Sequence, residues 1–314
     1  MRKIGWATKL AGKSSSTATR DVPVADLTDE VAMVLGAAGI PDTRKVTADI
    51  LAALLDVPRS WIVLNKYAPV DADFAMAAHV AAHVAALRLA AGAPFAYAVG
   101  RAQFRHLNLA VDSRVLIPRP ETEVLVGEIL SRFRAMRTDA ADWGVAVDIG
   151  TGSGAIALSL ATEGRFARVI ATDSSLDALD VAKRNATLAT PGRWCPVEFR
   201  CGSLMGPVRG ITARLLVSNP PYIAFGEAEQ LPASVRNWEP PTALLSGSSG
   251  LDATAAIVRG GVSLLESGGV LALEVDERRA SLVADMVMAE AAYVDVGVVL
   301  DLTGRERFVF ASRA

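Results

Sequence analysis

A short glycine-rich segment constrains the fold of this chain more than any other feature of the sequence. The apolar residues 145–147 lead into Asp148-Ile149-Gly150-Thr151-Gly152-Ser153-Gly154, and a second apolar stretch begins at Ala155. This order predicts a buried strand, a tight turn and the first turns of a helix. Glycines permit positive φ and let the backbone approach a ligand closely, while the helix N-terminus adds the positive end of a dipole. From residue 119 onward strands and helices alternate, which predicts a parallel sheet covered on both faces.

The next predicted strand, residues 169–172, ends at Asp173. A carboxylate about 20 residues beyond the glycines can accept hydrogen bonds from ribose hydroxyls. The pattern alone leaves the ligand open, because Gly150, Gly152 and Ala155 also fit the loose dinucleotide fingerprint of nicotinamide enzymes. A glycine turn with no ligand is a further reading.

A second motif, Asn219-Pro220-Pro221-Tyr222, directly follows the apolar run of residues 215–218. Proline cannot donate to a sheet ladder and restricts the residue before it, so the strand stops in a rigid corner. Two acceptors, the Asn219 side-chain carbonyl and the Pro220 backbone carbonyl, suit a planar NH2 group with its two N–H donors. The simpler reading is a proline turn that ends a strand. The motif follows the fourth strand of the predicted sheet, at the carboxyl edge where ligands bind in open α/β sheets.

The chain resembles the release-factor glutamine methyltransferases of the HemK/PrmC type, from about residue 25 to its end. The matching stretches are PFAYAVG at 94–100 with Phe104, VLIPRPETE at 115–123, the glycine turn, NPPYI at 219–223, WEP at 238–240, AL at 243–244, GLD at 250–252 and DLTGR at 301–305. The corner motif alone is shared with adenine-N6 and other amino-group methyltransferases, whereas the segment at 117–123 is much more specific.

This resemblance implies a class I S-adenosylmethionine-dependent methyltransferase with a Rossmann-like sheet. S-adenosylmethionine is the implied cofactor, and the implied substrate is the glutamine of the Gly-Gly-Gln loop of peptide-chain release factors. The residues expected to bind the cofactor are Gly150, Thr151, Gly152, Ser153, Gly154, Asp173, Ser203, Leu204 and Asn219. Catalysis is expected from Asn219, Pro220, Pro221 and Tyr222, which together with Phe104 would also bind the substrate. The chain departs from the family at Ser203 and Leu204, where an acidic residue usually precedes a bulky one; Leu204 can still pack on the adenine face.

Turn-forming residues and changes in the spacing of apolar residues predict four parts of the chain. These are a flexible tail at 1–22, a helical substrate-recognition domain at 23–100, a β-hairpin linker at 101–118 and a methyltransferase domain at 119–314. The hairpin is predicted from the alternation of Leu107, Leu109 and Val111 around Asp112-Ser113. Residues 294–300 and 307–311 are expected to add a closing antiparallel pair.

Composition is that of an ordinary soluble enzyme, with 51% hydrophobic residues and a formal net charge of −2. The balanced charge disfavours direct nucleic-acid binding, and no apolar stretch predicts a membrane span. Cys195 and Cys201 form no disulfide framework or zinc pattern, which favours free thiols in the cytoplasm. His79 and His83 stand four residues apart without a third ligand, so no metal is expected.

Two other functions stay open: methylation of an exocyclic base amine in nucleic acid, and a non-enzymatic binding module.

Overall fold

A computed structural model describes residues 22–70, 72–136, 142–189 and 195–314. The described residues divide into two compact units, those up to Arg101 and those from Ala102 onward. The tail expected at residues 1–22 lies outside the described residues except for Val22, which forms part of a short strand.

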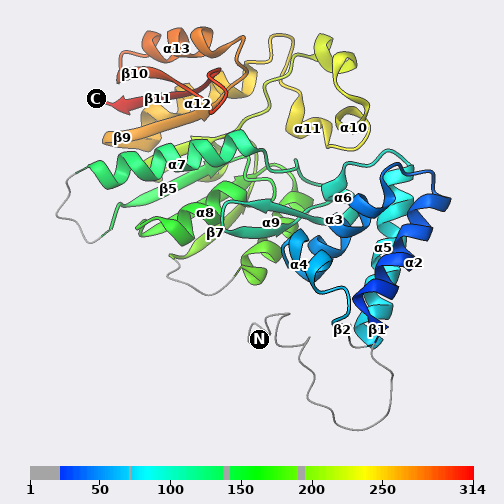
Figure 1. Cartoon of the computed structure of the whole chain (residues 1–314). Helices are drawn as coiled ribbons and strands as arrows, with labels where there is room; N and C mark the ends of the chain where they lie inside the picture. The colour runs from blue at the N-terminus through cyan, green and yellow to red at the C-terminus, as the bar shows by residue number, and fades with distance from the viewer. Residues whose placement is uncertain (1–21, 71, 137–141, 190–194) are drawn as a thin grey trace. The chain divides into compact units, whose positions relative to one another are not determined.

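The first unit is helical (Figure 1). Its elements are β1 (Val22–Pro23), α2 (Val24–Ala37), α3 (Thr43–Leu55), α4 (Arg59–Leu64), β2 (Pro69–Val70), α5 (Ala72–Ala90) and α6 (Phe95–Val99). The apolar side chains at helical spacing, such as Leu27, Val31 and Leu35 of α2, meet in one buried core. The predicted helical bundle is therefore confirmed, and the two-residue ladder between β1 and β2 is an addition to it.

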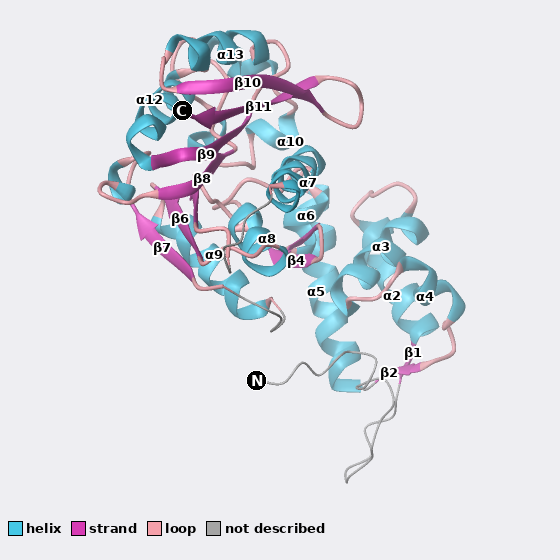
Figure 2. Cartoon of the chain, turned by 90° about the vertical axis from the view of Figure 1, so that its left-hand side faces the viewer, coloured by secondary structure: helices cyan, strands magenta, loops and turns pink. Residues whose placement is uncertain are grey.

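A seven-stranded sheet forms the centre of the second unit. Its strands are β5 (Val145–Ile149), β6 (Arg168–Asp173), β7 (Val197–Cys201), β8 (Ala213–Ser218), β9 (Leu265–Glu274), β10 (Tyr293–Leu300) and β11 (Glu306–Arg313). They lie in the order β10-β11-β9-β8-β5-β6-β7. Figure 2 shows β10, β11, β9 and β8 side by side in this order. The strands from β5 to β9 pair in parallel, while β11 pairs antiparallel with both β9 and β10. The expected closing pair is thus confirmed.

Helices cover both faces of this sheet. The longer ones are α7 (Pro120–Ala135), α8 (Ala155–Glu163), α9 (Leu176–Leu188), α12 (Asp252–Leu264) and α13 (Ala280–Ala289). Alternate residues of each strand face opposite sides, so Leu215 and Val217 of β8 join the core under α7 and α8, whereas Leu216 joins the core under α12 and α13. The sheet is buried on both sides, as parallel sheets require.

The hairpin lies earlier in the chain than predicted. Its strands are β3 (Arg101–Phe104) and β4 (Leu107–Ala110), so the turn falls at Arg105-His106 and the prediction of Asp112-Ser113 is wrong. Arg105 adopts φ 52°, and its guanidinium donates to both carboxylate oxygens of Glu163, at 2.7 and 2.6 Å. Asp112 instead closes a local turn, because its carboxylate accepts the backbone N–H of Arg114.

Among the described residues, every helix is either too short or too polar to span a lipid bilayer. Within the same residues no cluster of His, Cys, Asp and Glu side chains is arranged to hold a metal ion. His79 contacts Glu30 on the surface of the helical unit, with 3.0 Å between Nδ1 and Oε2.

Candidate active site

Two pockets open at the carboxyl edge of the sheet, and Asn219 lines both of them. The first, called here the glycine pocket, lies where the chain order reverses between β5 and β8. Its wall includes Gly150, Gly152, Asp173, Ser203, Leu204, Pro220 and Pro221. The second, called the tyrosine pocket, includes Arg119, Tyr222, Ile223, Glu227, Asp276, Arg278 and Arg307. A crevice at such a reversal is the expected ligand position in an open parallel sheet.

The glycine turn offers space to the first pocket rather than hydrogen-bond donors. The N–H groups of Gly150 and Thr151 both donate to the carbonyl of Thr172 on β6, and that of Gly152 donates to Oδ2 of Asp173 at 2.9 Å. A Cβ atom built at Gly150 or Gly152 would have no heavy atom within 4 Å, so a side chain there would fill open pocket space. Their φ angles of 74° and 53° also favour glycine.

Asp148, at the end of β5, supports this turn from below. Its Oδ2 accepts from the Thr151 hydroxyl at 2.7 Å and from the backbone N–H of Ala157 at 3.2 Å. The carboxyl is fully buried, and burial raises its pKa to about 7. Asp148 thus fixes the path of the chain from strand to helix.

Asp173 presents an acceptor to the glycine pocket. Its Oδ1 accepts the N–H of Ser175 at 2.9 Å while Oδ2 accepts that of Gly152, so the carboxylate is held at the pocket wall. Each carboxylate oxygen has two lone pairs, which leaves capacity for ribose hydroxyls. Leu204 is partly buried against the core and adds an apolar surface. A carboxylate, an apolar wall and an open glycine cradle together fit a nucleoside-containing cofactor.

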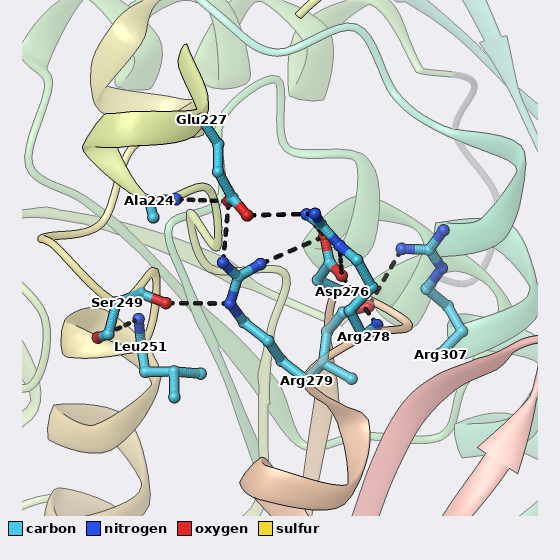
Figure 3. Close-up of polar contacts among 9 residues, drawn as sticks. Ala224, Glu227, Ser249, Leu251, Asp276, Arg278, Arg279 and Arg307 are labelled. Atoms are coloured by element: carbon cyan, nitrogen blue, oxygen red, sulfur yellow. Dashed lines mark hydrogen bonds and ion pairs between the residues drawn. The ribbon is translucent and has the colours of Figure 1, made fainter. Parts of the chain in front are cut away.

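The tyrosine pocket has a charged wall that joins two distant loops (Figure 3). Glu227, in the 3₁₀ helix η2 (Phe225–Gln230), pairs with Arg278 at 3.1 Å and with Arg279 at 2.9 Å. Asp276 pairs with the same two arginines from the loop after β9. Arg279 also donates to the carbonyl of Ser249. The network holds η2 against the β9–α13 loop and so fixes the shape of this pocket.

Hydrogen bonds to buried residues fix the side chain of Asn219. Its Nδ2 donates to the hydroxyl of Thr122, in the first turn of α7, at 3.2 Å. That hydroxyl donates in turn to Oε2 of Glu274, the last residue of β9, at 2.7 Å. The carbonyl oxygen Oδ1 is therefore the end of the amide left to accept from a ligand.

Tyr222 lies on the tyrosine pocket as a neutral phenol. Burial is the largest cause that raises its pKa, to about 12, and the carboxylate of Glu274 adds to the effect. Its main chain is fixed by Gly250, where φ is 78° and a Cβ would come within 2.4 Å of the Tyr222 carbonyl oxygen. The following residue, Ile223, exchanges backbone hydrogen bonds with Leu244 and Ser246.

Several predicted site residues have other positions. Phe104 is fully buried in the core under α7 and α8, and it is not among the residues that line either pocket. Its side chain packs in this core, and the substrate contact expected of it stays a prediction. Thr151 and Ser153 are buried, at 6% and 4% exposure, because they face inward from the turn. Neither they nor Gly154 are among the residues lining the glycine pocket, so the cofactor contacts expected of these three residues stay a prediction.

Sequence reasoning assigned no role to Thr122, Glu239 or Glu274. Thr122 lies in the segment at 117–123 that supports the family resemblance. The sequence therefore marks this residue, but it does not reveal the contact with Asn219. Glu239 is buried, and its carboxylate accepts from Arg119 at 2.5 Å and from the N–H of Ile117 at 3.2 Å. It thereby ties residues 117–119 to the loop that follows the corner motif.

The sheet order, the glycine turn and the corner motif define a class I S-adenosylmethionine-dependent methyltransferase. A family model described as "Methyltransferase small domain" matches residues 129–234. The hMettl16 catalytic domain in complex with MAT2A 3'UTR hairpin 1 shares this fold, with a TM-score of 0.53, 17% identity and coverage of 74% of this chain and 80% of that one.

Curated relatives narrow this class to one family. The release factor glutamine methyltransferase of Moorella thermoacetica is 42% identical over 72% of this chain and 77% of its own length. That of Xylella fastidiosa (strain Temecula1) is 38% identical over 88% and 95%. The chain belongs to the release factor glutamine methyltransferase family, and its methyl donor is S-adenosylmethionine.

Proposed function

We propose that the protein methylates the side-chain amide nitrogen (N5) of the glutamine in the Gly-Gly-Gln motif of peptide-chain release factors. One observation carries the proposal: the NH2 group of Asn219 is engaged by Thr122, which leaves its carbonyl oxygen as an acceptor where the two pockets meet. With the Pro220 carbonyl it makes a pair of acceptors for the two N–H bonds of a primary amide.

The residues of the glycine pocket would hold the cofactor. Asp173 would accept from the ribose hydroxyls, Leu204 would pack on the adenine, and Gly150 and Gly152 would leave room for the rest of the molecule. S-adenosylmethionine, when bound, supplies a methyl group made electrophilic by its sulfonium sulfur. Ser203 is exposed at the rim of this pocket, as a neutral residue where relatives of the family usually have an acidic one.

The chain's own task is to make a poor nucleophile reactive. An amide nitrogen is weakly nucleophilic because its lone pair is delocalised into the carbonyl. Acceptors at Asn219 and Pro220 would favour electron density on that nitrogen and would fix its orientation, so that much of the rate comes from alignment and preorganised dipoles. The neutral Tyr222 ring would form a wall beside the flat amide.

The tyrosine pocket would admit the glutamine side chain. Its lining includes Asn219 and Tyr222 together with three arginines, Arg119, Arg278 and Arg307. Such donors suit the carbonyl groups of an extended loop. Because Asn219 lines this pocket and the glycine pocket, cofactor and substrate would meet at its side chain.

We further propose that the helical part, residues 23–100, recognises the protein substrate, and that the protein works in the cytoplasm without contacting nucleic acid directly. The cofactor acceptor and the corner motif both lie in the second unit. Val63, Leu64 and Tyr67 of the first unit are exposed at 64%, 80% and 79%, which supplies apolar surface for a partner. The net charge of −2 favours a protein partner over a polyanion.

A transfer assay tests the proposed reaction. Tritiated S-adenosylmethionine would be offered to the protein with a release factor, with adenine-containing DNA, with RNA, and alone. We expect label on the release factor only. Label on nucleic acid with none on the release factor would refute the proposal.

A further inference from the structure

We propose that Thr122 and Glu274 are positioning residues that set the orientation of the Asn219 amide and thereby turn its carbonyl oxygen toward the substrate. This inference rests on the proposed function. It adds a role for two buried polar residues that are not among those lining either pocket.

The two hydrogen bonds that link Asn219, Thr122 and Glu274 connect three separate elements. Asn219 follows the end of β8, Thr122 lies in the first turn of α7, and Glu274 ends β9. The distances are 3.2 Å from Asn219 Nδ2 to Thr122 Oγ1 and 2.7 Å from Thr122 Oγ1 to Glu274 Oε2. Thr122 and Glu274 are 5% and 1% exposed, so bulk water does not compete for these bonds.

The chemistry of the three groups fixes the direction of both hydrogen bonds. An ionised carboxylate can only accept, so the single proton of the Thr122 hydroxyl is donated to Glu274. The hydroxyl oxygen then accepts, and only the NH2 end of Asn219 can donate to it. An amide whose two ends are otherwise nearly isosteric is thus forced into one orientation. Without that constraint, the NH2 end could face the substrate and would offer donors to an NH2 group.

Protonation of Glu274 would remove the constraint, because a carboxylic acid can donate. Burial raises the pKa of Glu274 to about 7, while the hydrogen bonds from Thr122 and Asn219 and the charge of Arg307 lower it and that of Glu121 raises it. These charged groups come from α7 and β11, and Tyr222 beside them stays neutral. The folded-state pKa is raised above the ordinary value of 4.5, so the carboxylate is present above pH about 7 and is lost below it. The fraction of molecules in which the Asn219 carbonyl oxygen faces the substrate should therefore decrease as the pH falls below about 7.

The first test needs no substrate. The side-chain amide of Asn219 would be followed by ¹⁵N NMR in the full-length protein, with its signals assigned by their loss in Asn219→Ala. We expect these signals to titrate with a midpoint near pH 7. Thr122→Val should move the midpoint to higher pH, because it removes a hydrogen bond that lowers the pKa of Glu274. Glu274→Gln should abolish the titration. A signal that does not titrate between pH about 5.5 and 8.5 would overturn the inference, whatever the substrate is.

The second test is kinetic, with release factor as the methyl acceptor. Thr122→Val should lower kcat at least about tenfold, equal to about 1.4 kcal/mol of barrier, with KM for S-adenosylmethionine nearly unchanged. Thr122→Ser keeps the hydroxyl and should restore most of the rate. Glu274→Gln should be slow at every pH and should lack the fall below pH 7 that the unaltered protein shows.

Matched controls separate positioning from packing. Thr162→Val removes a hydroxyl bond of 2.8 Å within α8, and Glu266→Gln neutralises a partly exposed carboxylate on the same strand as Glu274. Both should keep the rate and the pH profile of the unaltered protein. If Thr122→Ser were as slow as Thr122→Val, or if Glu274→Gln kept the acidic fall in rate, the two residues would be structural only. Absence of any methylation of release factor by the unaltered protein would refute the proposed function, and the NMR titration would still decide the orientation of Asn219.

Discussion

Glu239 holds Arg119 across 120 positions of the chain, through a hydrogen-bonded ion pair of 2.5 Å between Nη2 and Oε1. The carboxylate side chain is 1% exposed and the arginine 30%. Because Glu239 also accepts the N–H of Ile117, one buried charge connects the segment before α7 with the loop after the corner motif. The specific segment at 117–123 is thereby tied to the loop that follows the corner motif.

Arg119→Ala should lower the free energy of unfolding by about 3 kcal/mol, because it leaves a buried carboxylate without its cation. Arg168→Ala is the matched control, since Arg168 and Glu198 are both more than 40% exposed and 3.7 Å apart. It should cost less than about 1 kcal/mol. Chemical denaturation of both variants measures the difference. Equal losses would contradict a special role for the Glu239 pair.

Gly250→Ala should lower methyl transfer at least about tenfold, because the new Cβ must displace the backbone of Tyr222 and with it the corner motif. Binding of S-adenosylmethionine should change little, since Gly250 is not among the residues lining the glycine pocket. Gly226→Ala is a suitable control, as a Cβ there meets nothing within 4 Å. Normal transfer rates in Gly250→Ala would show that the position of Tyr222 is not critical.

Asp173→Ala should weaken S-adenosylmethionine binding about tenfold or more and should reduce the rate at saturation to a smaller extent. Contacts to the ribose are made equally in the ground state and the transition state, so they contribute to affinity rather than to kcat. Isothermal titration calorimetry gives the affinity, with Asp177→Ala in the nearby helix α9 as control. An unchanged affinity would mean that the carboxylate does not contact the cofactor.

Tyr222→Phe should keep most of the transfer rate, whereas Tyr222→Ala should lose it. Because the pKa of Tyr222 is raised to about 12, the phenol stays protonated throughout the range in which the enzyme works. Its ring, and not its ionisation, is then the useful part. Rate measurements from about pH 6 to 9, well below the pKa of a free tyrosine, should give parallel profiles for the Phe variant and the unaltered protein. A new pH dependence in the Phe variant would contradict this account.

The fold was largely predictable because its signals are local. Buried strands, the glycine turn and the proline corner each follow from short stretches of sequence, and parallel pairing places their ends at one edge. The hairpin was misplaced because Asp112-Ser113 resembles a turn and does form one, whereas the true turn uses Arg105 at positive φ. That conformation is stabilised by Glu163, which lies 58 positions away and has no local signature.

The candidate site was only partly predictable for the same reason. Asp173 and Asn219 end strands, so their positions follow from the pattern. Thr151 and Ser153 look like ligand-binding residues in the sequence, but the partners that draw Thr151 inward become visible only in three dimensions. The link from Asn219 through Thr122 to Glu274 joins three elements that are far apart in the chain, with separations of 97 and 152 positions. No spacing rule for a single segment could have found it.

Mapping the methyl group tests the proposed reaction most directly. A release factor would be incubated with S-adenosylmethionine and the unaltered protein or Asn219→Ala, and the peptide that contains Gly-Gly-Gln would then be fragmented in a mass spectrometer. We expect the mass gain of one methyl group on the glutamine side chain, and at least about a tenfold slower gain with Asn219→Ala although that variant stays folded. A methyl group on any other residue, or an unchanged rate with Asn219→Ala, would contradict the proposed reaction.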